Sequence, residues 1–156
     1  MINLSLSALQ LFILMAGYIV GLGAVSVIET LGFLGRKSPY FTESTIRAHK
    51  VTKPLIWLGL VIGLIGAVWI YGSNAVSLFG ENAYWPLQLH AVILVLMILN
   101  GSWLSFWLSP RLLAREREGR ITELLPARWQ LWTTLSFFVS IVTWWGSLVL
   151  WCLQIV

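Results

Sequence analysis

Four long apolar segments, separated by short polar ones, dominate this sequence and limit what the chain can fold into. They cover residues 6–34, 54–71, 86–108 and 131–153. A helix that crosses about 30 Å of hydrocarbon needs roughly 20 apolar residues, so each segment is long enough to span a membrane. Charged residues make up only 10% of the 156 residues, which leaves too little polar surface for a soluble globule. We therefore predict an all-α fold, a four-transmembrane-helix bundle, in a single integral membrane domain over residues 1–156.

The basic residues gather in two segments, residues 35–53 and 109–130, each with five Lys or Arg side chains. The segment between the second and third apolar runs carries one charge, Glu81, and the two termini carry none. Loops rich in Lys and Arg stay in the cytoplasm. We therefore expect both basic segments to be cytoplasmic loops of a bacterial-type inner membrane protein, with both termini outside (N-out/C-out).

The charge pattern and the cysteine count exclude several classes of protein. Basic residues next to a membrane contact anionic lipid headgroups, whereas a nucleic-acid site needs them on a surface that faces away from the membrane. We expect membrane lipids as partners, and no nucleic acid. Cys152 is the only cysteine, which rules out an intrachain disulfide or a C-x-x-C site. No basic residue precedes the first apolar segment, so we expect no signal peptide.

Proline, glycine and capping residues indicate where the helices begin, bend and end. The polar stretch before the second apolar segment can extend that helix, with Thr42 or Ser44 as its cap and a bend at Pro54. The third helix is expected to continue past its apolar segment through residues 110–117 and to stop at Gly119.

Trp and Tyr side chains gather near the ends of the predicted spans. Such aromatic belts form where helices meet the headgroup region, and they need no binding role. The residues concerned are Tyr84, Trp85, Trp103, Trp107, Trp129, Trp132 and Trp151.

Small residues predict where the helices pack. Burial of apolar surface gains little in lipid, so close contact between backbones has to hold a bundle together. Gly17 and Gly21 are four residues apart in the first segment, and Gly59 and Gly63 are four apart in the second. We expect these two helices to touch along their glycines.

A polar stripe follows one face of the fourth predicted helix. It is either a polar pathway or, as we favour, a packing seam whose hydroxyls bond to carbonyls one turn back. Asn100, at mid-depth in the third helix, is expected to bond across to this stripe, and a ligand or ion contact at the midplane is the alternative. The stripe consists of Thr133, Ser136, Ser140, Thr143 and Ser147.

Ionisable side chains within a span are costly, so each is a candidate site. Glu29, in the last two turns of the first span, is a candidate to relay protons or hold a cation. The favoured interpretation is an ion pair with Arg47, Lys50 or Arg36 at the level of the cytoplasmic headgroups. His49 lies among basic residues and is expected to be solvated or to face lipid, with a direct contact to Glu29 as the alternative.

His90 lies about one turn inside the third span. Haem ligation is the most specific hypothesis, because helical bundles hold axial histidines, and a bond to a neighbouring carbonyl or to outer water is the favoured alternative. One haem between both histidines is excluded, since a rise of 1.5 Å per residue separates His49 and His90 by about 27 Å in depth. Two histidines, one cysteine and no aspartate make a metal site of three or four protein ligands hard to assemble.

Three segments resemble a family of uncharacterised bacterial four-helix membrane proteins. They are GLGAVSVIETLGFLGRKS from Gly21 to Ser38, HKVTKPLIWLG from His49 to Gly59, and LNGSWLSFWLSPRLL from Leu99 to Leu113. The resemblance covers about a quarter of the chain and implies no reaction or cofactor. The layout is also similar to that of four-helix membrane cytochromes, from which this chain departs because it lacks stacked histidine pairs.

Three hypotheses for the function follow from these features. The leading one is a non-catalytic polytopic protein, either a homo-oligomer or a subunit of a larger membrane complex, because the parts outside the predicted spans are very short. The second is a haem-binding redox protein that uses His90. The third is a small transporter or channel lined by Glu29, Asn100 and the polar stripe. No hydrolase triad, phosphate-binding loop or dinucleotide motif is present, so we expect no catalytic residues.

Overall fold

The computed structural model describes residues 6–35, 38–74, 84–120 and 123–155, and nearly all of them are helical. No strand forms among these residues, which confirms the predicted all-α class. The elements are α1 (Leu6–Gly35), α2 (Pro39–Ser73), α3 (Trp85–Ser102), a π-helical segment η1 (Trp103–Leu108), α4 (Ser109–Arg117) and α5 (Ala127–Ile155).

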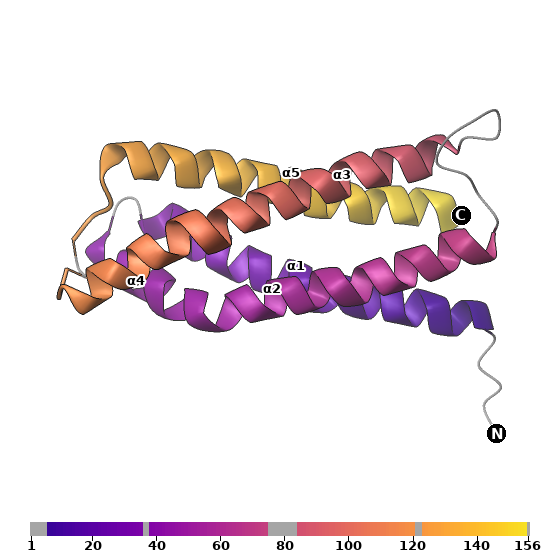
Figure 1. Cartoon of the computed structure of the whole chain (residues 1–156), viewed down its shortest axis with the longest axis horizontal. Coiled ribbons are helices and arrows are strands. Elements are labelled where there is room, and N and C mark those ends of the chain that lie inside the picture. Colours follow the sequence, from indigo (N-terminus) through magenta and orange to yellow (C-terminus); the bar gives the residue numbers. More distant parts are fainter. Residues whose placement is uncertain (1–5, 36–37, 75–83, 121–122, 156) are drawn as a thin grey trace, which may run out of the picture.

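Within the described residues, four helices are long and apolar enough to cross a membrane, as predicted. Figure 1 shows them side by side, with the two chain ends at one end of the bundle and α4 at the other. α1 packs along α2, and α5 contacts both α1 and α3. The membrane-length helices are Leu6–Leu34, Glu43–Ser73, Trp85–Arg117 and Ala127–Leu153, the third of which runs from α3 through η1 into α4.

α2 begins earlier than its capping signals predict. Its N-cap is Ser38, in extended conformation, and Pro39 occupies the first turn, so the prediction of Thr42 or Ser44 as the cap was wrong. A proline in the first turn already has the backbone angle that a helix needs, which explains the earlier start. The helix then runs through Pro54 without ending, and joins the polar stretch to the apolar segment.

α4 ends at Arg117, and Gly119 stops it as predicted. This glycine has a positive φ of 72°, a conformation that costs a residue with a Cβ about 1 kcal/mol or more. Two backbone hydrogen bonds close the turn, from Gly119 N to Glu116 O (3.1 Å) and from Arg120 N to Arg115 O (2.9 Å). They satisfy carbonyls at the end of the helix in the Schellman pattern.

The predicted glycine contact between the first two helices is present. A Cβ added at Gly17 would lie 2.2 Å from the backbone nitrogen of Gly63, and one added at Gly59 would lie 2.3 Å from that of Gly21. The two backbones are therefore in direct contact, and this close approach is what small residues permit in a bundle without a strong hydrophobic driving force.

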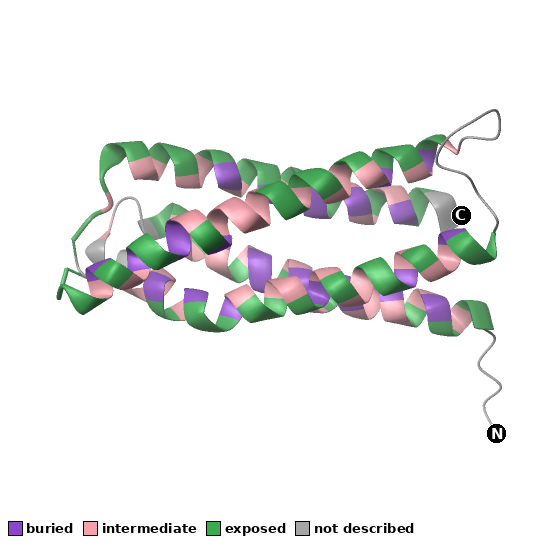
Figure 2. Cartoon of the chain, viewed as in Figure 1, coloured by how far each residue is buried: buried purple, intermediate pink, exposed green. Residues whose placement is uncertain are grey.

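The outside of the bundle is apolar. Figure 2 shows exposed residues along the outer faces of all the long helices and buried ones facing inward. Many of the exposed side chains are large and hydrophobic, including Phe12 (68% exposed), Ile19 (75%), Phe106 (73%) and Val142 (68%). So many exposed large apolar side chains are rare on soluble proteins and are typical of membrane or protein interfaces.

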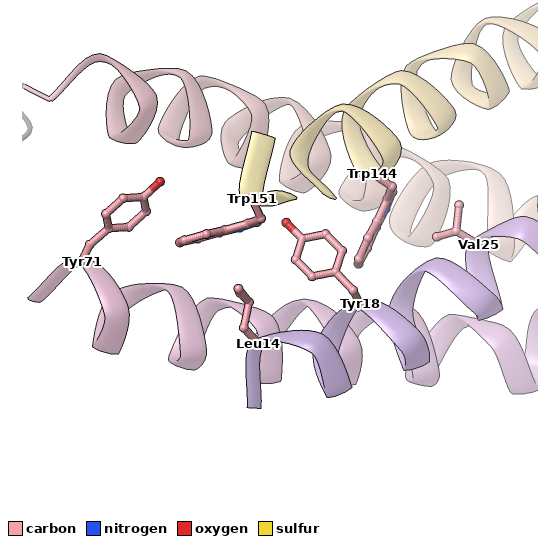
Figure 3. Close-up of a cluster of buried hydrophobic side chains, with 6 residues drawn as sticks. All are labelled: Leu14, Tyr18, Val25, Tyr71, Trp144 and Trp151. Carbon is pink, nitrogen blue, oxygen red and sulfur yellow. The ribbon is translucent and has the colours of Figure 1, made fainter. Parts of the chain in front are cut away.

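Trp151 was wrongly placed in the aromatic belt. It is buried, with 3% of its surface exposed, in a cluster with Leu14, Tyr18, Tyr71 and Trp144. Figure 3 shows the Trp151 ring between those of Tyr71 and Tyr18. The position of a tryptophan near a helix end gives its depth but not the direction in which it points, and here it points into the bundle.

Candidate functional site

A polar cavity of about 90 Å³ lies inside the bundle, in the half that contains α4. Its walls come from all the helical elements and are mostly apolar, and we call it the polar cavity after the few polar groups that line it. A volume of this size has room for a few water molecules. The polar groups in its walls include Glu29, His49, Lys53, Asn100, Ser105 and Ser140.

Glu29 projects from α1 into this cavity and is 8% exposed. Its Oε1 accepts a hydrogen bond of 2.8 Å from the Ser140 hydroxyl on α5. Glu29 makes no ion pair with any described residue. Burial of a carboxylate without a cationic partner among these residues is costly, so Glu29 is the strongest candidate for function.

The expected ion pairs of Glu29 with Arg47 and Lys50 do not form. Arg47 pairs with Glu43 one turn earlier in α2 (2.6 Å), and Lys50 pairs with Glu116 of α4 (2.8 Å). These carboxylates lie near the surface, where both basic side chains are more than half exposed, so pairing there avoids the burial of a charge. The third expected partner, Arg36, lies outside the described residues.

Asn100 connects α3 to α5 and continues the hydrogen bonding toward Glu29. Its Nδ2 donates to the Ser140 hydroxyl (2.9 Å) and to the Ser136 carbonyl (3.2 Å), and its Oδ1 accepts from the Ser136 hydroxyl (2.8 Å). Ser140 in turn donates to Glu29, so the donors are aligned toward the carboxylate. Aligned hydrogen bonds of this kind polarise one another and stabilise negative charge on the Glu29 carboxylate, the last acceptor of the series.

The polar stripe of α5 divides into two kinds of residue. Thr133 and Thr143 donate to carbonyls one turn back, Trp129 O (3.0 Å) and Val139 O (2.7 Å), as a packing seam predicts. The three serines instead contact other helices. Ser136 and Ser140 reach Asn100 and Glu29, and Ser147 bonds to the hydroxyl of Tyr18 on α1.

His49 is buried, not solvated or facing lipid, so the favoured prediction for this residue was wrong. It is 9% exposed, and its Nε2 has no hydrogen-bond partner among the described residues. Its side chain lines the same cavity as Glu29, although no hydrogen bond joins the two. A buried ring nitrogen without a partner costs about 1 to 3 kcal/mol, and this cost also points to a site that takes up a proton, ion or solvent.

The π-helical segment η1 supplies a feature of the site that the sequence interpretation missed. Lys53, which also lines the cavity, donates to the Ser105 carbonyl (3.1 Å), and Trp57 Nε1 donates to the Ser105 hydroxyl (3.0 Å). The available signal was Pro110, because a proline has no N–H and its ring clashes with the carbonyl four residues earlier, so the turn before it cannot keep regular α-helical hydrogen bonds. Short π segments within α-helices frequently mark functional sites.

His90 lies in the other half of the bundle, and both of its ring nitrogens are engaged. Nδ1 accepts from the Tyr71 hydroxyl (2.5 Å), Nε2 donates to the Ser147 carbonyl (3.3 Å), and the ring stacks on Trp151 with centroids 4.7 Å apart. An iron ligand would have to break one of these buried bonds, so the residues present do not fit a haem.

Other classes of site find no support in the structure. Among the described residues, no three His, Cys, Asp or Glu side chains are grouped so that they could hold a metal ion. Cys152 is free and exposed. Comparison of the chain with protein-family models, with curated proteins and with solved structures finds no match, so the resemblance to a bacterial four-helix family stays a prediction.

Proposed function

We propose that this chain is a multi-pass protein of a bacterial-type inner membrane, with both termini outside and the basic α4 end in the cytoplasm. Two observations support this arrangement. Large apolar side chains cover the outside of the bundle, where lipid tails would surround them. The ion pairs of the described residues all belong to the two basic segments of the sequence, at the α4 end of the bundle, which agrees with the positive-inside rule.

Within that membrane, we propose that the protein is a small transporter or channel that binds a proton or a monovalent cation at Glu29. The observation that carries the proposal is the buried Glu29 carboxylate, which accepts a hydrogen bond from Ser140, has no cationic partner within the described part of the chain and lies in a cavity between the helices. Desolvation of a carboxylate costs several kcal/mol, so Glu29 does not contribute to the stability of the bundle. A bound cation or proton would offset that cost.

The two other hypotheses have less support. The glycine pairs that suggested close helix packing are used within one chain, between α1 and α2, so they provide no contact for an oligomer. Assembly with itself or with other membrane subunits therefore stays a prediction from the sequence. The haem hypothesis is not supported, because both ring nitrogens of His90 have hydrogen-bond partners and neither is free to bind iron.

Flux through liposomes tests the proposed function. Purified protein is reconstituted with a pH-sensitive dye inside, and the proton flux is measured under a pH gradient and, separately, under gradients of sodium or potassium. We expect Glu29→Gln to reduce the flux at least tenfold, because the amide still accepts a hydrogen bond from Ser140 but holds neither a proton nor a cation. Glu29→Asp, which keeps the carboxylate, should retain part of the flux.

Glu43→Gln is the matched control, since it removes a carboxylate near the surface that pairs with Arg47 and does not line the cavity. Its flux should equal that of the wild type. Wild-type flux in Glu29→Gln, with the variant folded by circular dichroism, would refute the proposed function.

A further inference from the structure

A second and larger cavity, which we call the aromatic cavity, lies in the half of the bundle that contains the chain ends. Its volume is about 390 Å³, within the range of sites that hold small organic molecules. Residues of α1, α2, α3 and α5 line it. Its aromatic and imidazole members are Tyr18, Tyr71, His90, Trp144 and Trp151.

The rings around the aromatic cavity are held in place by one another. Tyr71 bonds to His90, and the Trp151 ring lies between those of Tyr71 and Tyr18 (Figure 3), with its centroid 4.9 Å from that of Tyr71 and 4.7 Å from that of His90. Tyr18 bonds to Ser147 and meets the Trp144 ring edge-on at 6.1 Å. A ligand would therefore meet preformed walls, and few side chains would have to be ordered when it binds.

The charge around this cavity favours a cation. No Lys or Arg of the described chain lines it, because the basic residues belong to the α4 end. The faces of Trp and Tyr rings carry partial negative charge and attract cations, most strongly where water is excluded. The polar cavity contains a carboxylate, Glu29, which makes no ion pair with any residue that the structure describes.

The two cavities adjoin each other. Leu60, Met97 and Trp144 line both of them, so these three side chains form the partition between the aromatic walls and the chamber that holds Glu29. Met97 is the most flexible of these three side chains.

The aromatic cavity also reaches the outer surface of the bundle. Its lining includes Leu64 and Val68 of α2, which are 39% and 63% exposed, and Ala91 of α3. The backbones of α2 and α3 make few close contacts, although Tyr71 of α2 bonds to His90 of α3. The exposed lining residues place the opening of the cavity on the surface that faces lipid in the proposed topology. A ligand that enters here has to dissolve in lipid first.

We infer that the aromatic cavity binds a lipid-soluble organic cation, whose positive charge is shielded by apolar groups, and delivers it toward Glu29. This inference rests on the proposed function and names its substrate class. The aromatic walls stabilise the charge, the opening between α2 and α3 selects for solubility in lipid, and the Glu29 carboxylate receives either the cation or a proton. Exchange of one for the other would couple the movement of the two.

Binding of tetraphenylphosphonium to the purified protein in detergent, measured by equilibrium dialysis, tests the inference. We expect saturable binding, with binding of the uncharged triphenylphosphine oxide at least tenfold weaker. Ala91→Phe should fill the cavity from α3 without removal of any core side chain, and should weaken tetraphenylphosphonium binding at least tenfold. Trp151→Leu should do the same through the loss of one aromatic ring, a loss worth roughly tenfold in a desolvated site.

Trp145→Leu is the control for these variants, because Trp145 is the next residue of α5 after Trp144 but is 49% exposed and does not line the cavity. Its binding should match that of the wild type. Equal affinity for the charged and uncharged probes, or wild-type affinity in Ala91→Phe, would overturn the inference. If tetraphenylphosphonium fails to bind while proton flux still depends on Glu29, this inference is refuted and the proposed function is not. If Glu29→Gln leaves the flux unchanged, the proposed function is refuted.

Discussion

The contact between α1 and α2 predicts that alanine has different effects on stability at two paired glycines. The glycine spacing alone does not predict this difference. A Cβ at Gly17 would lie 2.2 Å from Gly63 N, more than 1 Å inside the shortest ordinary contact of 3.4 Å. A Cβ at Gly63 would lie 3.9 Å from Gly17 Cα, an ordinary distance. Alanine should therefore be tolerated at Gly63 and not at Gly17.

The size of each effect follows from these distances. Gly17→Ala forces two backbones apart, and overpacking of this kind costs about 1 to 3 kcal/mol. Gly63→Ala makes an acceptable contact and reduces the freedom of the unfolded chain, which stabilises a helix by roughly 0.5 to 1 kcal/mol. Because 1.4 kcal/mol corresponds to a factor of ten, the two variants should differ by roughly tenfold to about 700-fold in their unfolding equilibrium.

Unfolding in mixed micelles by increasing amounts of sodium dodecyl sulfate, followed by circular dichroism, measures this difference. Gly23→Ala is the control within α1, because a Cβ there meets nothing within 4 Å, and it should behave like Gly63→Ala. Equal destabilisation by Gly17→Ala and Gly63→Ala would refute the described register of the two helices.

Two further predictions concern links between helices. Asn100→Leu removes the bonds to Ser136 and Ser140 and should destabilise the bundle by about 1 kcal/mol in the same unfolding assay, the usual size of an interhelical hydrogen bond in membranes; no change would show that the Asn100 bonds do not form. The Lys50–Glu116 pair is about half and one-third exposed, so a double-mutant cycle with alanine should give a coupling of roughly 0.2 to 1 kcal/mol that decreases in high salt. A coupling above that range, or one that salt leaves unchanged, would mean that the pair is buried.

The long helices and several links between them could be predicted from the sequence, because they depend on local patterns. Hydropathy over about 20 residues is enough to find a membrane-length helix, and the glycine spacing identifies the faces of α1 and α2 that touch. Asn100 is a polar group at mid-depth, so a partner on a neighbouring helix was the natural expectation, and the structure gives it Ser136 and Ser140.

The candidate site was harder to predict because it depends on which way side chains point around a helix and on which partners compete for them. Arg47 and Lys50 lie at suitable positions in the sequence to pair with Glu29, but each has a carboxylate near the surface within reach. His49 stands among basic residues yet turns inward from α2. The π turn of η1 lies next to Pro110 and is contacted by Lys53 and Trp57 of α2, and the hydrophobic periodicity of the sequence does not indicate it.

Infrared spectroscopy of the protein in lipid tests most directly the central claim that Glu29 is a carboxyl group inside the bundle that exchanges its proton. A pH titration should show the carbonyl stretch of a buried protonated carboxyl group, reversibly, in the wild type and in Glu43→Gln, and this band should be absent in Glu29→Gln. A band that persists in Glu29→Gln, or a wild-type spectrum in which no such group titrates, would contradict the claim.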